Sequence, residues 1–295
     1  MSSLVTRPRR AGLIVGVTGL LTWCVIASAQ APEAGPPASS SSTSDNQGPD
    51  ANSDSGEAPK QHPLLLDIEA YYTAPLRWDV KDWAYFGGAI GLVAAAHHYD
   101  TQVRTHFISE GSRAIGGSTQ DLHDTIPMVA AVTGTWLYAN ILDSNDGHRE
   151  AWDMVEAGGL ATTTAYALKY IAARERPDQT ADPDKWRASG SSFPSFHAAA
   201  AFAVGAVLAE SGNDDYRFIR RFLGYGAVAG FTAFERLKHN AHWLSDDVAG
   251  AEIGGATAHF VLEREEQRRE AARNYSVSVV PLQGGAMLTY SLNIQ

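Results

Sequence analysis

Residues 191–209 read Ser-Ser-Phe-Pro-Ser-Phe-His-Ala-Ala-Ala-Ala-Phe-Ala-Val-Gly-Ala-Val-Leu-Ala. A loop with a proline leads here into a run of small apolar residues, which favours a helix that begins near Ser195. Because small side chains allow helices to pack closely, such runs are typical of a tightly packed helical bundle. Similar Ala/Gly-rich apolar stretches occur at Trp83–His98, Thr125–Leu142, Ala157–Ile171, Phe222–Phe234 and Val248–Leu262. The sequence therefore predicts a mostly α-helical fold.

These stretches are short for membrane spans. A span needs about 20 predominantly apolar residues. The longest uncharged stretch, Thr125–Leu142, has 18 and includes Pro127 and Asn140. We therefore expect a bundle with an unusually buried core that does not cross a membrane. A monotopic or membrane-inserted form and a peripheral membrane contact remain alternatives.

The N-terminal part of the chain has a different composition. Residues 1–10 carry three arginines and no acid, residues 11–26 are apolar, and Ala27-Ser28-Ala29 follows. This order predicts a signal peptide at residues 1–29, with an uncleaved membrane anchor as the alternative. Residues 30–62 are rich in Ser, Pro, Gly and Ala, which predicts a disordered tether. We expect an exported protein of a bacterial periplasm, with one domain at residues 63–295.

The charge of the chain excludes some partners. The formal net charge is −10, and cleavage after Ala29 would remove three arginines and change it to −13. Such a chain is a poor candidate for binding nucleic acid, so an anionic substrate would need a local basic cluster. The single cysteine, Cys24, lies within the predicted signal peptide. The mature domain would therefore have no disulfide and no thiolate metal site.

The first basic cluster is Lys169-Tyr-Ile-Ala-Ala-Arg-Glu-Arg176-Pro177. Lys169 and Arg176 are seven positions apart, so they would share one face of a helix that ends at Pro177. Two cations on one face could clamp a phosphate group. Basic residues at a helix C-terminus are also common without any ligand, because they complement the helix dipole.

Two further segments carry histidines. Ser195 near a helix N-terminus could hold an anion, and His197 could supply a proton, although an ordinary capped helix has the same sequence pattern. In the third segment, Arg236 precedes His242 and Asp246. If this segment is helical, the Asp246 carboxylate lies on the same face as His242 and could make it a nucleophile. A surface pair of this kind would contribute almost nothing.

Together, the order Lys-x6-Arg-Pro, Pro-Ser-x-His and Arg-x5-His-x3-Asp resembles the type 2 phosphatidic acid phosphatase (PAP2) superfamily. That superfamily also includes bacterial class A acid phosphatases and vanadium-dependent haloperoxidases. The resemblance covers about residues 157–255 and implies a PAP2-like helical bundle. Two residues depart from the usual pattern: Phe196 replaces a glycine, and Glu235 replaces the serine that precedes Arg236.

The resemblance implies a metal-independent phosphatase that forms a phosphohistidine. His242 would attack phosphorus, Asp246 would orient His242, and His197 would protonate the leaving oxygen and then activate water. The phosphate oxygens would be held by Lys169, Arg176, Ser195, the backbone of Phe196, and Arg236. No metal or cofactor is implied, and vanadate would inhibit because it mimics the transition state.

Several functions are compatible with this resemblance. A soluble acid phosphatase would act on phosphomonoesters, and a lipid phosphatase would act on lipid phosphates or diphosphates. A haloperoxidase would use the same pocket with vanadate as its cofactor. A non-catalytic envelope protein would keep only the fold. The sequence contains no indication of an oligomeric state.

The remaining segments support simpler interpretations. His97-His98 with Asp100 has no matching third ligand segment, so we expect no metal site there. Glu263–Arg273 is rich in charge, which is typical of a solvated helix end. Residues 275–280 and 287–294 flank Gly284-Gly285, and the second run alternates apolar and polar residues. This pattern predicts a short C-terminal β-hairpin.

Overall fold

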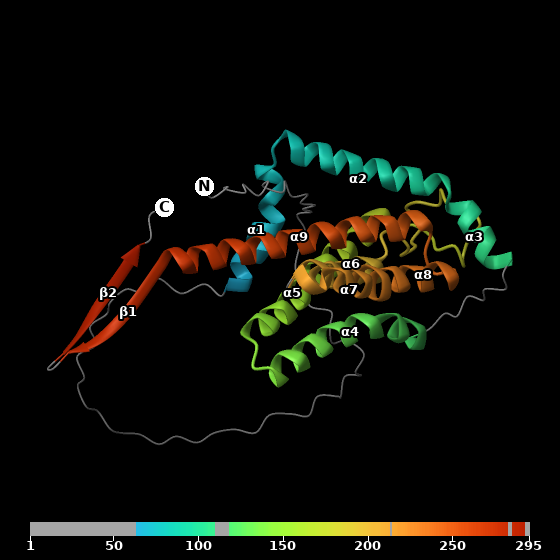
Figure 1. Ribbon diagram of the computed structural model, residues 1–295. Coiled ribbons are helices and arrows are strands. Elements are labelled where there is room, and N and C mark those ends of the chain that lie inside the picture. The colour runs from blue at the N-terminus through green and yellow to red at the C-terminus, as the bar shows by residue number, and fades with distance from the viewer. Residues whose placement is uncertain (1–62, 110–117, 213, 283–284, 293–295) are drawn as a thin grey trace, which may run out of the picture.

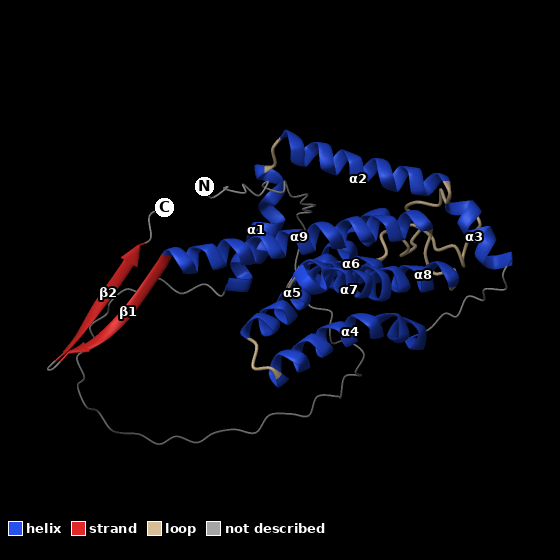
Figure 2. Ribbon diagram, in the orientation of Figure 1, coloured by secondary structure: helices blue, strands red, loops and turns tan. Residues whose placement is uncertain are grey.

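The computed structural model describes residues 63–109, 118–212, 214–282 and 285–292, and these are mostly helical (Figures 1 and 2). The helices are α1 (Pro63–Thr73), α2 (Val80–His98), α3 (Asp100–Ser109), α4 (Ser118–Ile141), α5 (Asn145–Ala172), α6 (Phe196–Glu210), α7 (Arg217–Arg221), α8 (Phe231–Lys238) and α9 (Leu244–Asn274). Short 3-10 helices at Ala74–Arg77 and Asp214–Tyr216 and a π-helical segment at Phe222–Gly230 connect some of them. The prediction of a mostly helical fold is confirmed, since the predicted apolar stretches lie in helices apart from Leu142, which follows the end of α4. The predicted signal peptide and tether lie outside the described residues.

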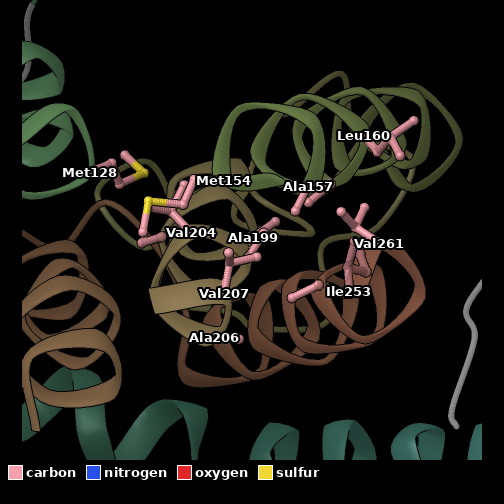
Figure 3. Close-up of a cluster of buried hydrophobic side chains, with 14 of the residues drawn as sticks. Met128, Met154, Ala157, Leu160, Ala199, Val204, Ala206, Val207, Ile253 and Val261 are labelled. Carbon is pink, nitrogen blue, oxygen red and sulfur yellow. The ribbon is translucent and has the colours of Figure 1, made fainter. Parts of the chain in front are cut away.

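Helix α6 lies at the centre of the bundle, where it packs against α4, α5, α8, α9 and the π-helical segment. The core between α5, α6 and α9 combines many alanines with a few larger side chains (Figure 3). The larger ones include Met128, Met154, Leu160, Val204, Val207, Ile253 and Val261. Because the alanine side chain is short, the helices approach closely. Residues that are far apart in the sequence can therefore meet at the ends of these helices.

Two glycines of α9 allow its backbone to touch that of α6. A Cβ atom at Gly250 would lie 2.5 Å from the carbonyl oxygen of Ser195. A Cβ atom at Gly254 would lie 2.3 Å from the carbonyl oxygen of Ala199. Neither distance leaves room for a side chain, so a larger residue would push α9 away from α6. This contact fixes the separation between the N-terminal parts of the two helices.

The outer helices expose many large apolar side chains. They include Val80, Trp83, Tyr85, Ile90 and Leu92 on α2, and Leu122, Ile126, Val129, Trp136, Leu137, Tyr138 and Ile141 on α4. Others are Trp152, Tyr166, Tyr170 and Ile171 on α5, and Phe218, Ile219, Phe222 and Leu223 on α7 and the π-helical segment. None of the helices in the described part of the chain is both long and apolar enough to cross a membrane.

Helix α9 continues directly into a two-stranded antiparallel sheet. Strand β1 (Tyr275–Leu282) pairs with β2 (Gly285–Leu292), and the register places Tyr275 opposite Leu292. The two strands extend beyond the end of α9, away from the helices (Figure 1). The hairpin is therefore remote from the N-terminal parts of α6 and α9.

Candidate active site

The residues proposed for catalysis gather where α5 ends and where α6 and α9 begin. Lys169 lies in the last turn of α5, Ser195 caps α6, and Arg236 lies in α8. His197 is in the first turn of α6, and His242 and Asp246 flank the start of α9. Most of this set is buried: Lys169, Ser195, His197, Arg236, His242 and Asp246. The bundle therefore encloses a polar site at this end.

The prediction that Lys169 and Arg176 share a helix face is wrong. Helix α5 ends at Ala172, and Ala173 adopts a left-handed conformation with φ 43°. The Ala173 carbonyl accepts N–H groups from Ala188 and Gly190, so the following loop folds back and stabilises this break. The helix thus ends before Arg176, and the end is not caused by Pro177.

Helix α9 begins at Leu244, so His242 precedes the helix that holds Asp246, and the condition of a shared helix is not met. The two side chains still meet, because His242 Nδ1 lies 3.5 Å from Asp246 Oδ2. The same oxygen accepts the Trp243 backbone N–H at 2.9 Å. The carboxylate thus holds the turn that precedes α9 and faces the imidazole.

His242 is poised as a neutral base. Burial lowers its pKa well below the usual value, and the positive charges of Lys169, Arg236 and Arg176 act in the same direction. The charges of these three side chains therefore all act on the imidazole. A neutral imidazole keeps a nitrogen lone pair at neutral pH. Its Nε2 atom makes no hydrogen bond within the described residues.

Lys169 is held by the loop that leads into α6. Its Nζ donates hydrogen bonds to the carbonyl oxygens of Ser191 at 2.7 Å and Ser192 at 3.2 Å. Burial lowers the pKa of Lys169 to about 7, and the charge of Arg176 adds to this effect. The ammonium is therefore only partly charged near neutral pH, and a bound anion would favour the charged form.

The start of α6 has the predicted cap. The Ser195 hydroxyl accepts the Ala198 N–H at 3.3 Å, and the Ser195 N–H donates to the Asp246 carbonyl at 2.9 Å. The ring of Phe196 lies 3.9 Å from that of His197, centroid to centroid. Lys169 Nζ lies 5.4 Å from the same Phe196 ring. The phenylalanine that replaces the usual glycine therefore shapes the surroundings of two site residues.

Arg236 has a buried carboxylate partner on another helix. Its Nη1 lies 2.5 Å from Asp124 Oδ2 on α4, and both side chains are 1% exposed. The neighbouring Glu235 pairs with Lys238 at 3.1 Å and with His239 at 3.5 Å. The charge of Glu235, which departs from the usual serine, is thus matched by residues of its own helix and its C-terminal cap.

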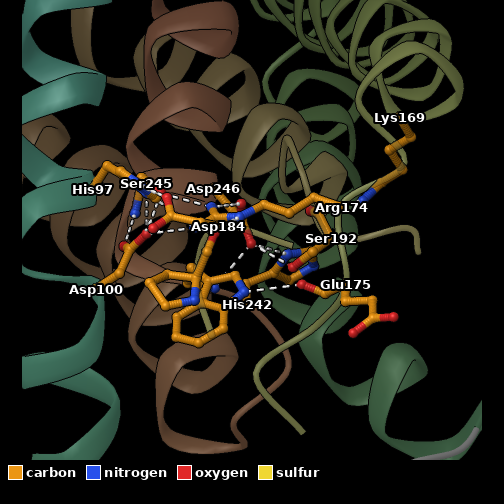
Figure 4. A network of polar contacts seen from close by, with 12 residues as sticks. His97, Asp100, Lys169, Arg174, Glu175, Asp184, Ser192, His242, Ser245 and Asp246 are labelled. Carbon is orange, nitrogen blue, oxygen red and sulfur yellow. Dashed lines mark hydrogen bonds and ion pairs between the residues drawn. The ribbon is translucent and has the colours of Figure 1, made fainter. Parts of the chain in front are cut away.

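Sequence reasoning missed several buried polar residues of the site (Figure 4). Asp246 Oδ1 accepts a hydrogen bond from Arg174 Nη1 at 2.6 Å, and Oδ2 accepts one from the Ser192 hydroxyl. Arg174 lies in the basic segment that the sequence singled out, but it has no special spacing there. Asp247 is also buried beside the site, and burial raises its pKa well above the usual value.

His97 and Asp100 contact each other and a third carboxylate. His97 Nδ1 lies 2.8 Å from Asp100 Oδ2, and Nε2 lies 2.9 Å from Asp184 Oδ1. Over the described ranges, no three His, Cys, Asp or Glu side chains are grouped to hold a metal ion. His97 and Asp100 instead belong to the hydrogen-bond network that reaches Asp246.

The segment that contains most of these residues is similar to known proteins. The PAP2 superfamily model matches residues 150–270. That segment of the chain is similar to the PAP2 superfamily. A lipid A 1-phosphatase of Porphyromonas gingivalis is 36% identical over 106 residues, which are 36% of this chain and 20% of the relative. The chain thus spans only a fifth of the length of this curated relative.

Two solved bacterial structures are also similar. Aquifex aeolicus LpxE is 20% identical, with 50% of this chain and 88% of that chain covered and a TM-score of 0.34. The first transmembrane PAP2 type phosphatidylglycerolphosphate phosphatase from Bacillus subtilis is 18% identical. That comparison covers 69% of this chain and 92% of the other, with a TM-score of 0.37.

Proposed function

We propose that this protein is a phosphatase that hydrolyses lipid phosphates or diphosphates through a phosphohistidine intermediate. The observation that carries the proposal is the buried His242, which has a carboxylate at Nδ1 and three cationic side chains around it. A neutral imidazole among cations is suited to attack an anionic phosphorus centre, because the cations both attract the anion and keep the imidazole unprotonated.

The reaction would proceed in two displacements. His242 Nε2 forms a bond to phosphorus while the bond to the leaving oxygen breaks, and His197 gives that oxygen a proton. Water then attacks phosphorus, gives its proton to His197, and the bond between phosphorus and nitrogen breaks. Asp246 stabilises the positive charge that His242 carries in the intermediate. No redox step and no cofactor takes part in these two displacements.

The phosphoryl oxygens carry the negative charge that must be stabilised in both displacements. Cationic side chains and the N–H groups at the start of α6 supply this stabilisation. The groups that we propose for it are Lys169, Arg176, Arg236, the Ser195 hydroxyl and the Phe196 N–H. Because these groups are positioned before the substrate binds, little reorganisation is needed during the reaction.

The exposed apolar faces favour a lipid substrate over a small soluble one. Monomeric soluble proteins rarely expose large contiguous apolar patches, and such patches mark contacts with lipids or partners. Here large apolar side chains are exposed along α2, α4 and α5, including Trp83 at 51% and Trp152 at 70%. The similarity to a lipid A 1-phosphatase supports the same substrate class. We propose that the protein acts at a membrane surface of a bacterial envelope.

Phosphate release tests this function. The purified protein would be offered lipid A or a prenyl diphosphate in detergent micelles, and p-nitrophenyl phosphate in buffer, each with EDTA. We expect turnover of the lipid substrates that survives EDTA and is inhibited by vanadate. His242→Ala should lower kcat at least about 10⁴-fold, because it removes the nucleophile.

Other outcomes would point to other functions. A preference for p-nitrophenyl phosphate would indicate a soluble acid phosphatase. Halide oxidation with vanadate and peroxide would indicate a haloperoxidase. Equal turnover in the wild type and His242→Ala would refute the proposed role of His242. The matched control His259→Ala changes a half-exposed histidine of α9 and should leave kcat unchanged.

A further inference from the structure

A buried chain of charges leads from the outer helices to the site. Arg174 donates from Nη1 to Asp246 Oδ1 at 2.6 Å and from Nη2 to Asp100 Oδ2 at 2.7 Å. All three side chains are 0% exposed. Arg174 therefore divides its positive charge between two carboxylates, of which only Asp246 faces His242 (Figure 4).

The guanidinium of Arg174 has little freedom to turn. Its Nε and Nη2 donate to the Pro183 carbonyl at 3.0 and 2.8 Å. The ring centroids of Trp186 and Trp243 lie 4.5 and 5.3 Å from its central carbon. Because the planar fork is fixed, Nη1 and Nη2 cannot exchange carboxylate partners.

Asp100 is held as firmly as Arg174. Its Oδ1 accepts the Ser245 N–H at 2.8 Å, and its Oδ2 accepts the Ser245 hydroxyl at 2.7 Å. His97 Nδ1 lies 2.8 Å from the same Oδ2. Ser245 is the immediate neighbour of Asp246, so Asp100 contacts the start of α9 as well as Arg174. Asp100 itself lies outside residues 150–270, the segment that matches the superfamily.

We propose that Asp100 is a positioning residue for the reaction, which acts through Arg174 and Ser245 to hold the Asp246 carboxylate toward His242 and to keep it basic. By taking part of the positive charge of Arg174, Asp100 leaves Asp246 with more negative charge for His242. The imidazole is then a stronger nucleophile, and its charged intermediate is better stabilised. This inference rests on the proposed phosphatase function.

Other charged groups near Asp246 set the background for its ionisation. These groups are His97 of α2, Lys169 of α5, Arg174 of the loop after α5, Arg236 of α8, and His242 and Asp247 beside it on the chain. Asp184 contacts His97 from the loop after α5, but its side chain is 74% exposed. Among these groups, His97 and Arg174 contact Asp100 directly, so its substitution changes their contacts and leaves the other side chains in place. The effect of Asp100 on Asp246 can therefore be separated from theirs by comparing single variants.

The test compares pH–rate profiles of the full chain and three variants. In Asp100→Asn, Arg174 gives its whole charge to Asp246, so kcat should fall about tenfold and the acidic limb should move to lower pH. In Arg174→Lys, the charge stays but the fork is lost, so kcat should fall and the acidic limb should move to higher pH. Asp184→Asn is the matched control at the exposed end of the network and should match the wild type. KM should change little in all three.

Opposite shifts of the acidic limb would support the proposal, because a purely structural role would not move it in two directions. Unchanged profiles in folded Asp100→Asn and Arg174→Lys would overturn it. If Asp100→Asn does not fold, Arg174→Lys alone decides. If the wild type hydrolyses no phosphate ester, the proposed function fails. Carbon-13 NMR titration of the Asp246 carboxyl then decides the positioning role, which an unchanged pKa in both variants would refute.

Discussion

The two ends of helix α9 carry two clusters of charge that differ in their surroundings. At the N-terminal end, Asp246 and Arg174 are fully buried, and their hydrogen bonds fix each side chain in one orientation. Toward the C-terminal end, Arg264 and Arg268 pair with Asp67 of α1, yet they remain 34% and 36% exposed. A charge in water can move and be screened, whereas a buried charge keeps its position and strength. The comparison shows that the buried charges at the N-terminal end of α9 are suited to catalysis, whereas the exposed charges toward its C-terminal end connect α9 to α1.

The largest effect is expected from a substitution that disrupts the buried cluster. Asp246→Asn should lower kcat about 10³- to 10⁴-fold, since the amide cannot stabilise a positive His242 as a carboxylate does. Steady-state kinetics on the preferred lipid substrate measure this. Asp146→Asn, at a 79% exposed carboxylate, is the control and should leave kcat unchanged. A loss smaller than about tenfold in Asp246→Asn would show that the carboxylate has no catalytic part.

A second effect concerns stability at the other cluster. Burial, together with the charge of Glu265, raises the pKa of Asp153 of α5 to about 7. Its folded pKa exceeds its unfolded pKa of about 3.9, so the stability it contributes is complete below pH 4 and is lost as pH rises to about 7. Asp153→Asn should remove this dependence.

The size of that effect follows from the shift in pKa. A change from about 3.9 to about 7 corresponds to at most about 4 kcal/mol in the free energy of unfolding. Above pH 7 the Asp153→Asn variant should therefore be more stable than the wild type in urea unfolding, with no change in kcat. Parallel pH dependences of the two proteins would contradict this expectation.

The smallest expected effect is a pH dependence of anion binding at Lys169, near the N-terminal end of α9. The pKa of Lys169 is lowered to about 7, so its charge is lost as pH rises from 6 to 8. Competitive inhibition by sulfate, which stays fully ionised in this range, should weaken by at most about tenfold. Lys169→Arg should bind sulfate equally at both pH values, because arginine stays charged. The same pH dependence in both proteins would exclude Lys169 as its source.

Apolar patterns predicted the helices well, because burial of Ala/Gly-rich stretches needs only local sequence and helix geometry. They did not predict where α5 ends. That end depends on Ala173 in a left-handed conformation, which alanine rarely adopts, and on hydrogen bonds from a loop that returns to it. Glu263–Arg273 was expected to be solvated, but Arg264 and Arg268 reach the buried Asp67, 197 and 201 positions away.

The spacing of the motifs identified the candidate catalytic residues, but it did not identify the buried side chains that hydrogen-bond to them. Lys169, Arg236 and His242 were chosen because the order of their motifs is distinctive, and in the structure the charges of Lys169 and Arg236 act on the His242 imidazole. Asp100 and Arg174 are 74 positions apart and Asp124 and Arg236 are 112 positions apart. A single aspartate so far along the chain from its partner belongs to no recognisable sequence motif. Asp100 and Asp124 are identified only by the packing of α3 and α4 near the site.

The contact of Gly250 and Gly254 with the backbone of α6 has a consequence for the tolerance of the protein to mutation. A scan of all single substitutions, scored by phosphate release, should find these two glycines as intolerant as the histidines, although they touch no substrate. The outward residues of α2 and α4 take no part in this contact. Engineers could therefore replace those apolar side chains with polar ones to obtain a variant that needs no detergent, while the spacing of the catalytic groups stays as it is.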